Sequence, residues 1–358
     1  MRRGKPFAAG IAAWVLLGAA AAVAFALTRP ATPELRGMAV TPPYPVADFT
    51  LTDQWGRPFQ LASLRGKAVL MFFGYTFCPD VCPATMLQYK GIRQALGRDT
   101  ERVALLFISV DPERDTPGRL REYLGYFDAA ILGLTGTPQA VSQVTAQYGV
   151  VAEKVPVPGS GAGYLMNHTA LIYLIGPSGQ MRAMFPHGSK VEDIVHDVRL
   201  VLREPVKAQR PADAGQVARA ATSGGEQPPP AAPAYGGTVH VEGAWARPAP
   251  GMGATSAVYM TLVNRGDRPD ALVAVRSDVA RAIELHETRI ENNVMRMRRV
   301  ERIEVPPGGR VQLTPGGLHA MLIGLTRKLE EGDRFQAVLV FEHGGELTIE
   351  IPVRQPGP

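Results

Sequence analysis

Two cysteines, Cys78 and Cys82, are the side chains whose type and spacing first indicate chemistry, and the 358-residue chain contains no others. Any disulfide within the chain must therefore join them, and any thiolate metal site must use them. A helix that begins at Pro79 would lower the pKa of both thiols through its N-terminal dipole. A helix that begins at Pro83 would leave both cysteines in a loop, free to approach each other or to share a metal ion. The spacing alone does not decide between redox chemistry and metal binding.

The start of the chain predicts a membrane segment. Arg2, Arg3 and Lys5 precede an uncharged stretch at residues 7–27. As a helix this stretch would measure about 32 Å, against roughly 30 Å of bilayer hydrocarbon. The basic flank is expected in the cytoplasm, which places the rest of the chain outside it. An uncleaved anchor is the favoured interpretation, and a signal peptide cleaved near residues 24–26 is the alternative.

Composition divides the remaining chain into two domains. The net charge of +5 is mild, and no segment combines clustered Lys and Arg with stacking aromatic residues, so nucleic-acid binding is not expected. Residues 206–237 contain mostly Ala, Gln, Pro, Gly and Ser, which is typical of a flexible linker, and residues 28–44 form a shorter one. We therefore expect domains at residues 45–205 and 238–358, after an N-terminal segment at residues 1–27.

The first domain alternates strand and helix patterns, and it is predicted to be an α/β domain with a thioredoxin-like fold. A βαβ core followed by a ββα tail is the arrangement of that fold. The expected strands lie in a hairpin at residues 48–61 and at residues 69–73, 103–110, 169–175 and 181–185. The expected helices run from the cysteines to about Leu96, onward from Asp115 or Thr116, from Thr137 to about Gly149, and from Ser189 to Leu202.

Three segments of this domain, in order along the chain, resemble the SCO/SenC family of copper chaperones: residues 74–83, 109–117 and 164–169. Together they cover nearly the whole domain. The resemblance implies that copper is bound by two cysteines and one histidine, which correspond here to Cys78, Cys82 and His168. Asn167 stands where the family often has Asp, and it is a neighbour of the ligand rather than a ligand.

The sequence pattern around His168 supports its role as a metal ligand less strongly than the family resemblance does. A single His before an apolar strand is commonly structural, but strand ends are also where such folds place ligands. Two thiolates and an imidazole suit copper, above all Cu(I) and also Cu(II), whereas structural zinc would need a fourth protein ligand. His187 and His196 have no partner at a useful spacing and are expected at the surface. Asp111 and Asp115 are expected to shape and cap their loop.

The second domain shows the spacing of short strands and Gly-rich or Pro-rich turns that is typical of an all-β sandwich. Charged residues mostly alternate within these strands, which indicates that one face is solvated. The expected strands lie at residues 256–264, 270–275, 282–287, 294–300, 310–313, 320–325, 334–341 and 346–353.

Side chains alternate between the two faces of a strand, and in three of these strands this alternation places histidines and methionines together on one face. Met295 and Met297 share one strand face, and His319 and Met321, two residues apart, project the same way. His286 projects from a neighbouring strand. Methionines commonly only fill a core, but a methionine stripe beside two histidines favours a ligand role.

The spacing of these residues matches the motif of the periplasmic PCuAC copper chaperones, and residues 244–248 and 319–325 resemble that family too. The resemblance covers the whole domain and implies a cupredoxin-like β-sandwich. It also implies one Cu(I) held by two histidines and two methionines: His286, Met297, His319 and Met321. Met295 shares the face of Met297 and is an alternative candidate for its place. Thioether and imidazole ligands carry no charge, which favours the monovalent ion.

The N-terminal segment predicts a membrane-anchored, extracytoplasmic protein, and both resemblances imply a metallochaperone that delivers copper to the dinuclear copper centre of cytochrome c oxidase. The expected partners are the copper-site subunit of that oxidase, other periplasmic copper chaperones and thioredoxin-like reductants. Two alternatives stay open. One is a thiol-disulfide oxidoreductase that uses Cys78 and Cys82 to keep the oxidase cysteines reduced, and the other is a copper-scavenging or tolerance protein. The lack of cysteine in the second domain disfavours a purely redox role.

The linker at residues 206–237 predicts that the two sites of one chain can meet. Its 32 residues span roughly 30 Å as a flexible coil, which gives an effective concentration on the order of a millimolar. Thiolates are expected to bind Cu(I) more strongly than thioethers. Copper is therefore expected to pass from the His/Met site to the Cys/His site.

Overall fold

The structure is a computed structural model that describes residues 34–204, 234–236, 238–249 and 251–355. The predicted membrane segment at residues 7–27 lies outside these residues, as does most of the predicted linker. In the part of the chain that is described, no helix is both long and apolar enough to cross a bilayer. Both predicted domains belong to the compact unit that runs from Arg36 to Pro358.

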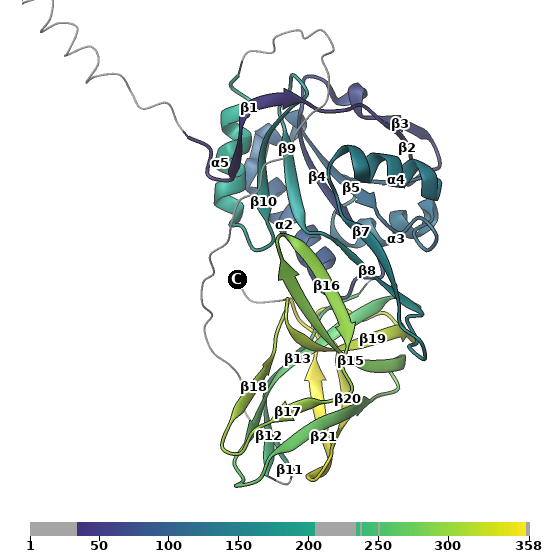
Figure 1. The fold of residues 1–358 in the computed structure, drawn as a ribbon, viewed down its shortest axis with the longest axis vertical. Helices are drawn as coiled ribbons and strands as arrows, with labels where there is room; N and C mark the ends of the chain where they lie inside the picture. Colours follow the sequence, from purple (N-terminus) through teal and green to yellow (C-terminus); the bar gives the residue numbers. More distant parts are fainter. Residues whose placement is uncertain (1–33, 205–233, 237, 250, 356–358) are drawn as a thin grey trace, which may run out of the picture. The chain divides into compact units, whose positions relative to one another are not determined.

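The first domain is built on an eight-stranded sheet with the order β1-β10-β9-β4-β5-β6-β2-β3 (Figure 1). The apolar strand β4 is buried along its whole length, and it runs parallel to β5 and antiparallel to β9. The strands are β1 (Met38–Pro45), β2 (Thr50–Asp53), β3 (Pro58–Gln60), β4 (Ala68–Gly74), β5 (Val103–Ser109), β6 (Ile131–Thr135), β9 (Leu171–Ile175) and β10 (Gln180–Pro186).

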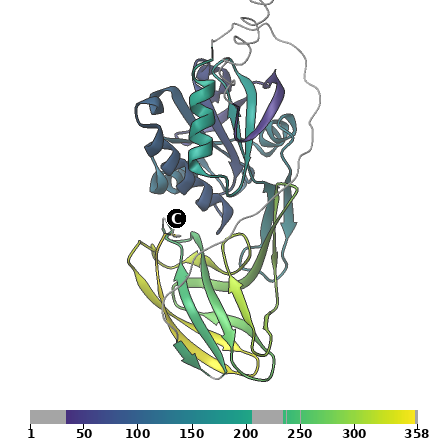
Figure 2. The same ribbon diagram turned by 90° about the vertical axis from the view of Figure 1, so that its left-hand side faces the viewer.

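Helices pack on this sheet, and Figure 2 shows α5 as the teal helix across one face of it. Thr116 and Thr137 cap two helices as the sequence predicts, because each hydroxyl accepts a hydrogen bond from a backbone N–H in the first turn and proline follows. The helices are α2 (Val81–Leu96), α3 (Pro117–Phe127), α4 (Pro138–Gln147) and α5 (Val191–Val201), with short 3₁₀ turns η1 (Leu61–Leu64) and η2 (Gly97–Arg102). This β4-α2-β5 core with its β9-β10-α5 tail is the predicted thioredoxin-like arrangement.

Several details of the first domain differ from the sequence prediction, among them strands at residues 152–156 and 164–169 that were not expected. Helix α2 begins at Val81 and therefore includes Cys82, whereas the sequence allowed starts at Pro79 and at Pro83. Residues 38–45, expected within a linker, form β1, which pairs with β10. This strand is mostly exposed and contains prolines, which an edge strand tolerates. Strand β6 was not expected, because five residues interrupted by a glycine carry little pattern.

The second domain is a sandwich of two sheets around an apolar core, as predicted. One sheet contains β11-β12-β13-β18-β19-β15-β16, and the other has the order β17-β14-β20-β21. Strands β11, β12 and β17 were not among those expected. The strands are β11 (Ala234–Gly236), β12 (Val239–Ala246), β13 (Thr255–Asn264), β14 (Asp270–Arg276), β15 (Ala280–Glu291), β16 (Val294–Arg299), β17 (Ile303–Val305), β18 (Arg310–Leu313), β19 (Leu318–Leu325), β20 (Arg334–Phe341) and β21 (Gly345–Pro352).

A hairpin of the first domain joins the sheet of the second. Strands β7 (Ala152–Pro156) and β8 (Tyr164–Thr169) pair with each other, and β8 also pairs with β16. The result is a continuous nine-stranded sheet, in which the green strand β16 lies beside β8 (Figure 1). The strand that carries His168 is therefore hydrogen-bonded to a strand that carries predicted ligands of the other site.

Candidate metal centres

Cys78, Cys82 and His168 come together beyond the carboxyl end of β4. All three side chains are buried, and their ligand atoms lie within 4.8 Å of one another. The Cys82 Sγ atom lies 3.5 Å from His168 Nε2. The fold therefore brings together the three residues that the SCO/SenC resemblance selects.

Local structure at the end of β4 places the two thiols. A Cβ atom on Gly74 would lie 2.9 Å from Cys82 Sγ, so a residue without a side chain is needed for the thiol to approach the strand. Asp80 occupies the N-cap position of α2, which puts Cys82 in the first turn. Cys78 stays in the preceding loop, where its N–H donates to the Tyr75 carbonyl oxygen at 3.3 Å.

The ring of His168 is held so that its Nε2 atom faces the thiols. Its Nδ1 atom lies 3.0 Å from the Thr169 carbonyl oxygen. Because a carbonyl oxygen can only accept, Nδ1 carries a proton and donates it to Thr169, which turns Nε2 towards the thiols. Phe72 and Tyr75 pack edge-on against the ring, with centroids 6.0 and 5.7 Å away. The ring is thus oriented so that Nε2 could serve as a metal ligand beside the two thiols.

The two thiols differ in acidity. Burial alone would raise the pKa of Cys78, but hydrogen bonds with Cys82 and His168 outweigh burial and hold that pKa well below its ordinary value. Burial raises the pKa of Cys82 well above its ordinary value, and the neighbouring Cys78 adds to this increase. Cys78 is therefore the thiolate of the pair, and a metal ion that takes both sulfurs must displace the proton of Cys82.

Asp111 and Asp115 shape the loops behind the site, as the sequence predicts. The carboxylate of Asp115 accepts hydrogen bonds from the N–H and hydroxyl of Thr76 and from the hydroxyl of Ser109. Burial raises the pKa of Asp115 to about 6 despite these hydrogen bonds. Asp111 accepts a 2.7 Å hydrogen bond from the Tyr164 hydroxyl. Both carboxylates are engaged in holding the loops together.

The two histidines predicted at the surface, His187 and His196, are both partly exposed. His196 is partly exposed and lies 2.9 Å from Asp197. His187 is only half-exposed; burial lowers its pKa, and the charges of Asp80 and Cys78 also act on it. The charges that act on His187 place the turn between β10 and α5 near the cysteine loop.

In the second domain, strand register places the predicted ligands on one face. His286 lies opposite His319 between β15 and β19, and Thr288 lies opposite Met297 between β15 and β16. Directly opposite residues project to the same face, as do residues two apart on one strand. His286, Met297, His319 and Met321 therefore share a single face, which we call the ligand face. Met295 lies on it as well, as the sequence predicts.

The ligand face is turned away from the core of the sandwich, since Leu285 and Leu322, which alternate with the ligands, belong to that core. The four predicted ligands are nevertheless at most 3% exposed. Part of their cover comes from the first domain, because Glu284 of the ligand face accepts hydrogen bonds from the Ser160 hydroxyl at 2.7 Å and the Gly161 N–H at 2.8 Å. Contact between the two domains thus buries the second site.

Each histidine of the ligand face leaves one buried nitrogen atom for a ligand. His286 Nε2 donates to Glu284 at 3.1 Å, and His319 Nδ1 donates to the Gly317 carbonyl oxygen at 3.0 Å. The other ring nitrogens, His286 Nδ1 and His319 Nε2, have no hydrogen-bond partner among the described residues. Buried polar atoms without partners are rare in native proteins. These two fit a metal ion that approaches from the ligand face.

Glu284 orients His286 in the manner of a carboxylate behind a metal-binding imidazole. Burial raises the pKa of Glu284, but hydrogen bonds from His286, Ser160 and Gly161 outweigh burial and bring the pKa to about 2. The carboxylate is therefore charged and holds the proton of His286 on Nε2. Two neutral imidazoles and two thioethers make up a soft, uncharged donor set, which suits Cu(I).

Asp80, between the two cysteines, is held by the second domain. Its carboxylate accepts hydrogen bonds from the Tyr259 hydroxyl at 3.0 Å and the Gly316 N–H at 2.7 Å, and it lies 3.4 Å from the Arg247 guanidinium. Asp80 is fully buried, and Arg247 is nearly so. Sequence reasoning missed this pair, because no local pattern connects residues 167 positions apart. The contact closes the second domain over the cysteine loop.

Replacing Arg247 by Met is expected to loosen this contact and expose the thiols. Removing one partner of a buried ion pair costs about 3–5 kcal/mol, because the other charge is left unpaired. Separation of the domains relieves that cost by hydrating Asp80. We expect Cys78 and Cys82 of the reduced, metal-free variant to be alkylated by iodoacetamide about tenfold faster or more, as followed by mass spectrometry. Arg327→Met, at an exposed ion pair, is the control. An unchanged rate would mean that the first domain alone shields the thiols.

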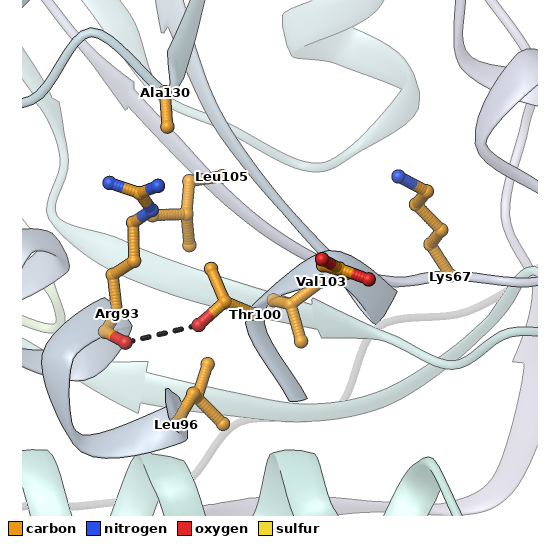
Figure 3. Close-up of a pocket in the computed structure, with 8 residues that line it drawn as sticks. Lys67, Arg93, Leu96, Thr100, Val103, Leu105 and Ala130 are labelled. Carbon is orange, nitrogen blue, oxygen red and sulfur yellow. Dashed lines mark hydrogen bonds between the residues drawn. The ribbon is translucent and has the colours of Figure 1, made fainter. Parts of the chain in front are cut away.

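Figure 3 shows a pocket elsewhere on the first domain. It is lined by residues of α2, η2 and β5, among others, including Arg93, Thr100 and Glu101. The Thr100 hydroxyl donates to the Arg93 carbonyl oxygen across it at 3.1 Å. None of its lining residues is Cys, His or Met, so the pocket contributes no ligand to either site.

Comparison with known proteins matches families to both domains. The SCO1/SenC family model matches residues 41–203, and the LpqE-like lipoprotein model matches residues 239–353. The SCO2-like protein of Rickettsia conorii is 34% identical over 152 residues, which are 42% of this chain and 74% of that protein. This chain belongs to the SCO1/SenC family. Its Cys/Cys/His cluster lies within the SCO1/SenC match, and its His/Met cluster lies within the LpqE-like match.

Two solved structures are also similar to this SCO1/SenC protein. ScoI of Bradyrhizobium japonicum with copper bound is 42% identical, with a TM-score of 0.41, and covers 44% of this chain and 98% of its own. The copper-bound PCuAC domain from PmoF2 is 34% identical, with a TM-score of 0.30, and covers 35% of this chain and 99% of its own.

Proposed function

We propose that this SCO1/SenC protein is a copper metallochaperone that binds one Cu(I) in each domain and delivers copper to the dinuclear copper centre of cytochrome c oxidase. The observation that carries the proposal is that one chain holds two buried sets of soft donor atoms. In each set, histidine nitrogen atoms are left available to bind a metal ion. Thiolate, thioether and imidazole donors suit Cu(I). The proposed ligands are Cys78, Cys82 and His168 in the first domain, and His286, Met297, His319 and Met321 in the second.

The two sites differ in a way that favours transfer in one direction. The second site has only uncharged donors, whereas the first has a thiolate at Cys78 and gains another when Cys82 loses its proton. Thiolates hold Cu(I) more strongly than thioethers. Copper is therefore proposed to move from the His/Met site to the Cys/His site and then to the copper-site subunit of the oxidase. The pairing of β8 with β16, which brings ligand-bearing strands together, supports a relay within one chain.

The test is copper delivery to the reduced, copper-free copper-site domain of the oxidase. The copper-loaded chain is mixed anaerobically with this domain, the two proteins are separated, and the copper bound to the target is measured by atomic absorption. We expect the Cys78→Ser, Cys82→Ser variant to deliver about tenfold more slowly or worse, because the last donor site is lost. Equal delivery from that variant, or from a Cu(I) chelator buffered to the same free copper, would contradict the proposal.

A thiol-disulfide oxidoreductase is the second candidate, and the acidity of the two thiols favours it. The Cys78 thiolate would attack a target disulfide, forming a mixed disulfide and releasing one target thiolate. Cys82 would then resolve it, leaving a Cys78–Cys82 disulfide and two reduced target thiols. The same delivery experiment distinguishes the two functions when the target is supplied oxidised and the chain copper-free, because only a reductase generates target thiols.

The proposal places both domains outside the cytoplasm, with residues 7–27 as the membrane anchor. The basic residues before this segment and its length of about one bilayer support that orientation. Protease accessibility of the full-length chain in intact spheroplasts tests it, since cytoplasmic domains would be protected.

A further inference from the structure

The two ligand clusters meet where β16 pairs with β8. Met295 lies directly opposite His168 in this antiparallel ladder, and Val294 lies opposite Thr169. Beyond the ladder, the Ala170 N–H donates to the Asn293 carbonyl oxygen at 2.8 Å, which holds the register. Side chains directly opposite each other project to the same face, with Cβ atoms about 4.5–5.5 Å apart. Met295 and His168 are both 0% exposed, so a thioether and an imidazole share a dry surface between the two sites.

Met295 is also in line with the second site. It lies two residues before Met297 on β16, on the same ligand face, about 6.6 Å away along the strand. Met297 in turn lies opposite Thr288, next to His286 on that face. The face therefore presents Met297, Met295 and His168 in succession. The first belongs to the proposed donor site, and the last belongs to the proposed acceptor site.

The packing of the sandwich does not account for Met295. The core between the two sheets contains Met260 but not Met295, and Met295 lies on the face turned away from that core. A leucine of nearly the same volume would fill the space equally well. What methionine adds at this position is a polarisable sulfur atom that can bind a soft metal ion.

We infer that Met295 is the stepping ligand of the relay, a thioether that holds Cu(I) in transit between Met297 and His168. The inference rests on the proposed transfer between the two sites. Copper remains Cu(I) throughout, and no electron is exchanged. The bond to Met295 sulfur forms as a bond to a second-site histidine or methionine breaks. The copper then gains His168 Nε2 and Cys78 Sγ and leaves Met295, while Cys82 binds as a thiolate and releases its proton to solvent.

The test compares Met295→Leu with wild type in the full chain, using Met260→Leu as a matched control for a buried methionine on the opposite face of the same sheet. With Cys78 and Cys82 joined in a disulfide, one equivalent of Cu(I) is loaded anaerobically on the second domain. Excess phosphine then reduces the disulfide, and near-ultraviolet thiolate-to-copper absorption reports the arrival of copper. A copper-free sample gives the rate of reduction alone.

We expect Met295→Leu to keep both copper equivalents, with chelator-competition affinities within about twofold of wild type, and to slow transfer about tenfold or more. Met260→Leu is expected to transfer as wild type does. A transfer rate in Met295→Leu equal to that of wild type would overturn the inference, because copper would then pass from Met297 to His168 without Met295. Loss of a copper equivalent would also overturn it, since Met295 would be a resting ligand, and equal slowing by Met260→Leu would assign the effect to packing. Absence of transfer in wild type would instead refute the proposed relay.

Discussion

The chain with Cys78 and Cys82 both replaced by Ser is expected to bind one Cu(I) where the wild type binds two. A serine hydroxyl is a hard donor that does not replace a thiolate for Cu(I), and His168 alone cannot retain the ion. The second site shares no ligand with the first, so its copper should remain. Replacing Met297 and Met321 by Leu should remove the other equivalent. Both thioether ligands would be gone, and the two imidazoles that remain should not hold Cu(I) against the competing chelator. Titration against a competing Cu(I) chelator measures both stoichiometries.

Because the two clusters lie close together, the variants also test whether one copper ion is shared between the two domains. Met295 and His168 are direct neighbours across the ladder, so a single copper ion held between the domains is a concrete alternative. In that case either double variant would lose all copper. Met260→Leu is the control for removal of a buried methionine, and circular dichroism checks that each variant keeps its sheet content.

Oxidation of Cys78 and Cys82 to a disulfide is expected to remove copper from the first domain and leave the second unchanged. Disulfide sulfurs are no longer thiolate ligands, and the ligand atoms of the cluster, within 4.8 Å of one another, are close enough for the bond to form with little rearrangement. One of the two copper equivalents should be lost on mild oxidation and regained after reduction with phosphine. The chelator titration, run on both forms, measures this.

Methionine oxidation must be separated from this effect. Intact mass shows whether any methionine has gained an oxygen atom, which would weaken the second site by another route. If copper left both domains together while every methionine stayed unmodified, the division of ligands between the two domains would be wrong.

Local sequence already determines much of both sites. Cys78 and Cys82 are the only thiols in the chain, so any thiolate chemistry is confined to them before folding is considered. The period of two along a strand decides that Met295 and Met297 face one way and Arg296 the other, and the structure agrees. Capping by Thr116 and Thr137 is likewise local, because the hydroxyl and the N–H that it accepts from are three residues apart.

The sequence could not show what packs against the ligand face. Alternation decides which side chains share a face, but whether a sandwich core or another domain covers that face depends on contacts between distant segments. The contacts of Asp80 with Arg247 and of Glu284 with Ser160 are of this kind. The start of α2 at Val81 is another case, because prolines at 79 and 83 both permit a first turn.

The opposition of Met295 and His168 is the clearest example of what only the tertiary structure decided. Both residues could be recognised in the sequence as ligand candidates, one for each site, and nothing local indicated that their strands would pair. Register between two strands that are far apart in sequence is set when their surroundings pack, by hydrogen bonds such as that between Ala170 and Asn293. The sequence indicated the candidate donors of two soft-metal sites, and folding decided that the histidine and methionine donors of both lie on one continuous sheet.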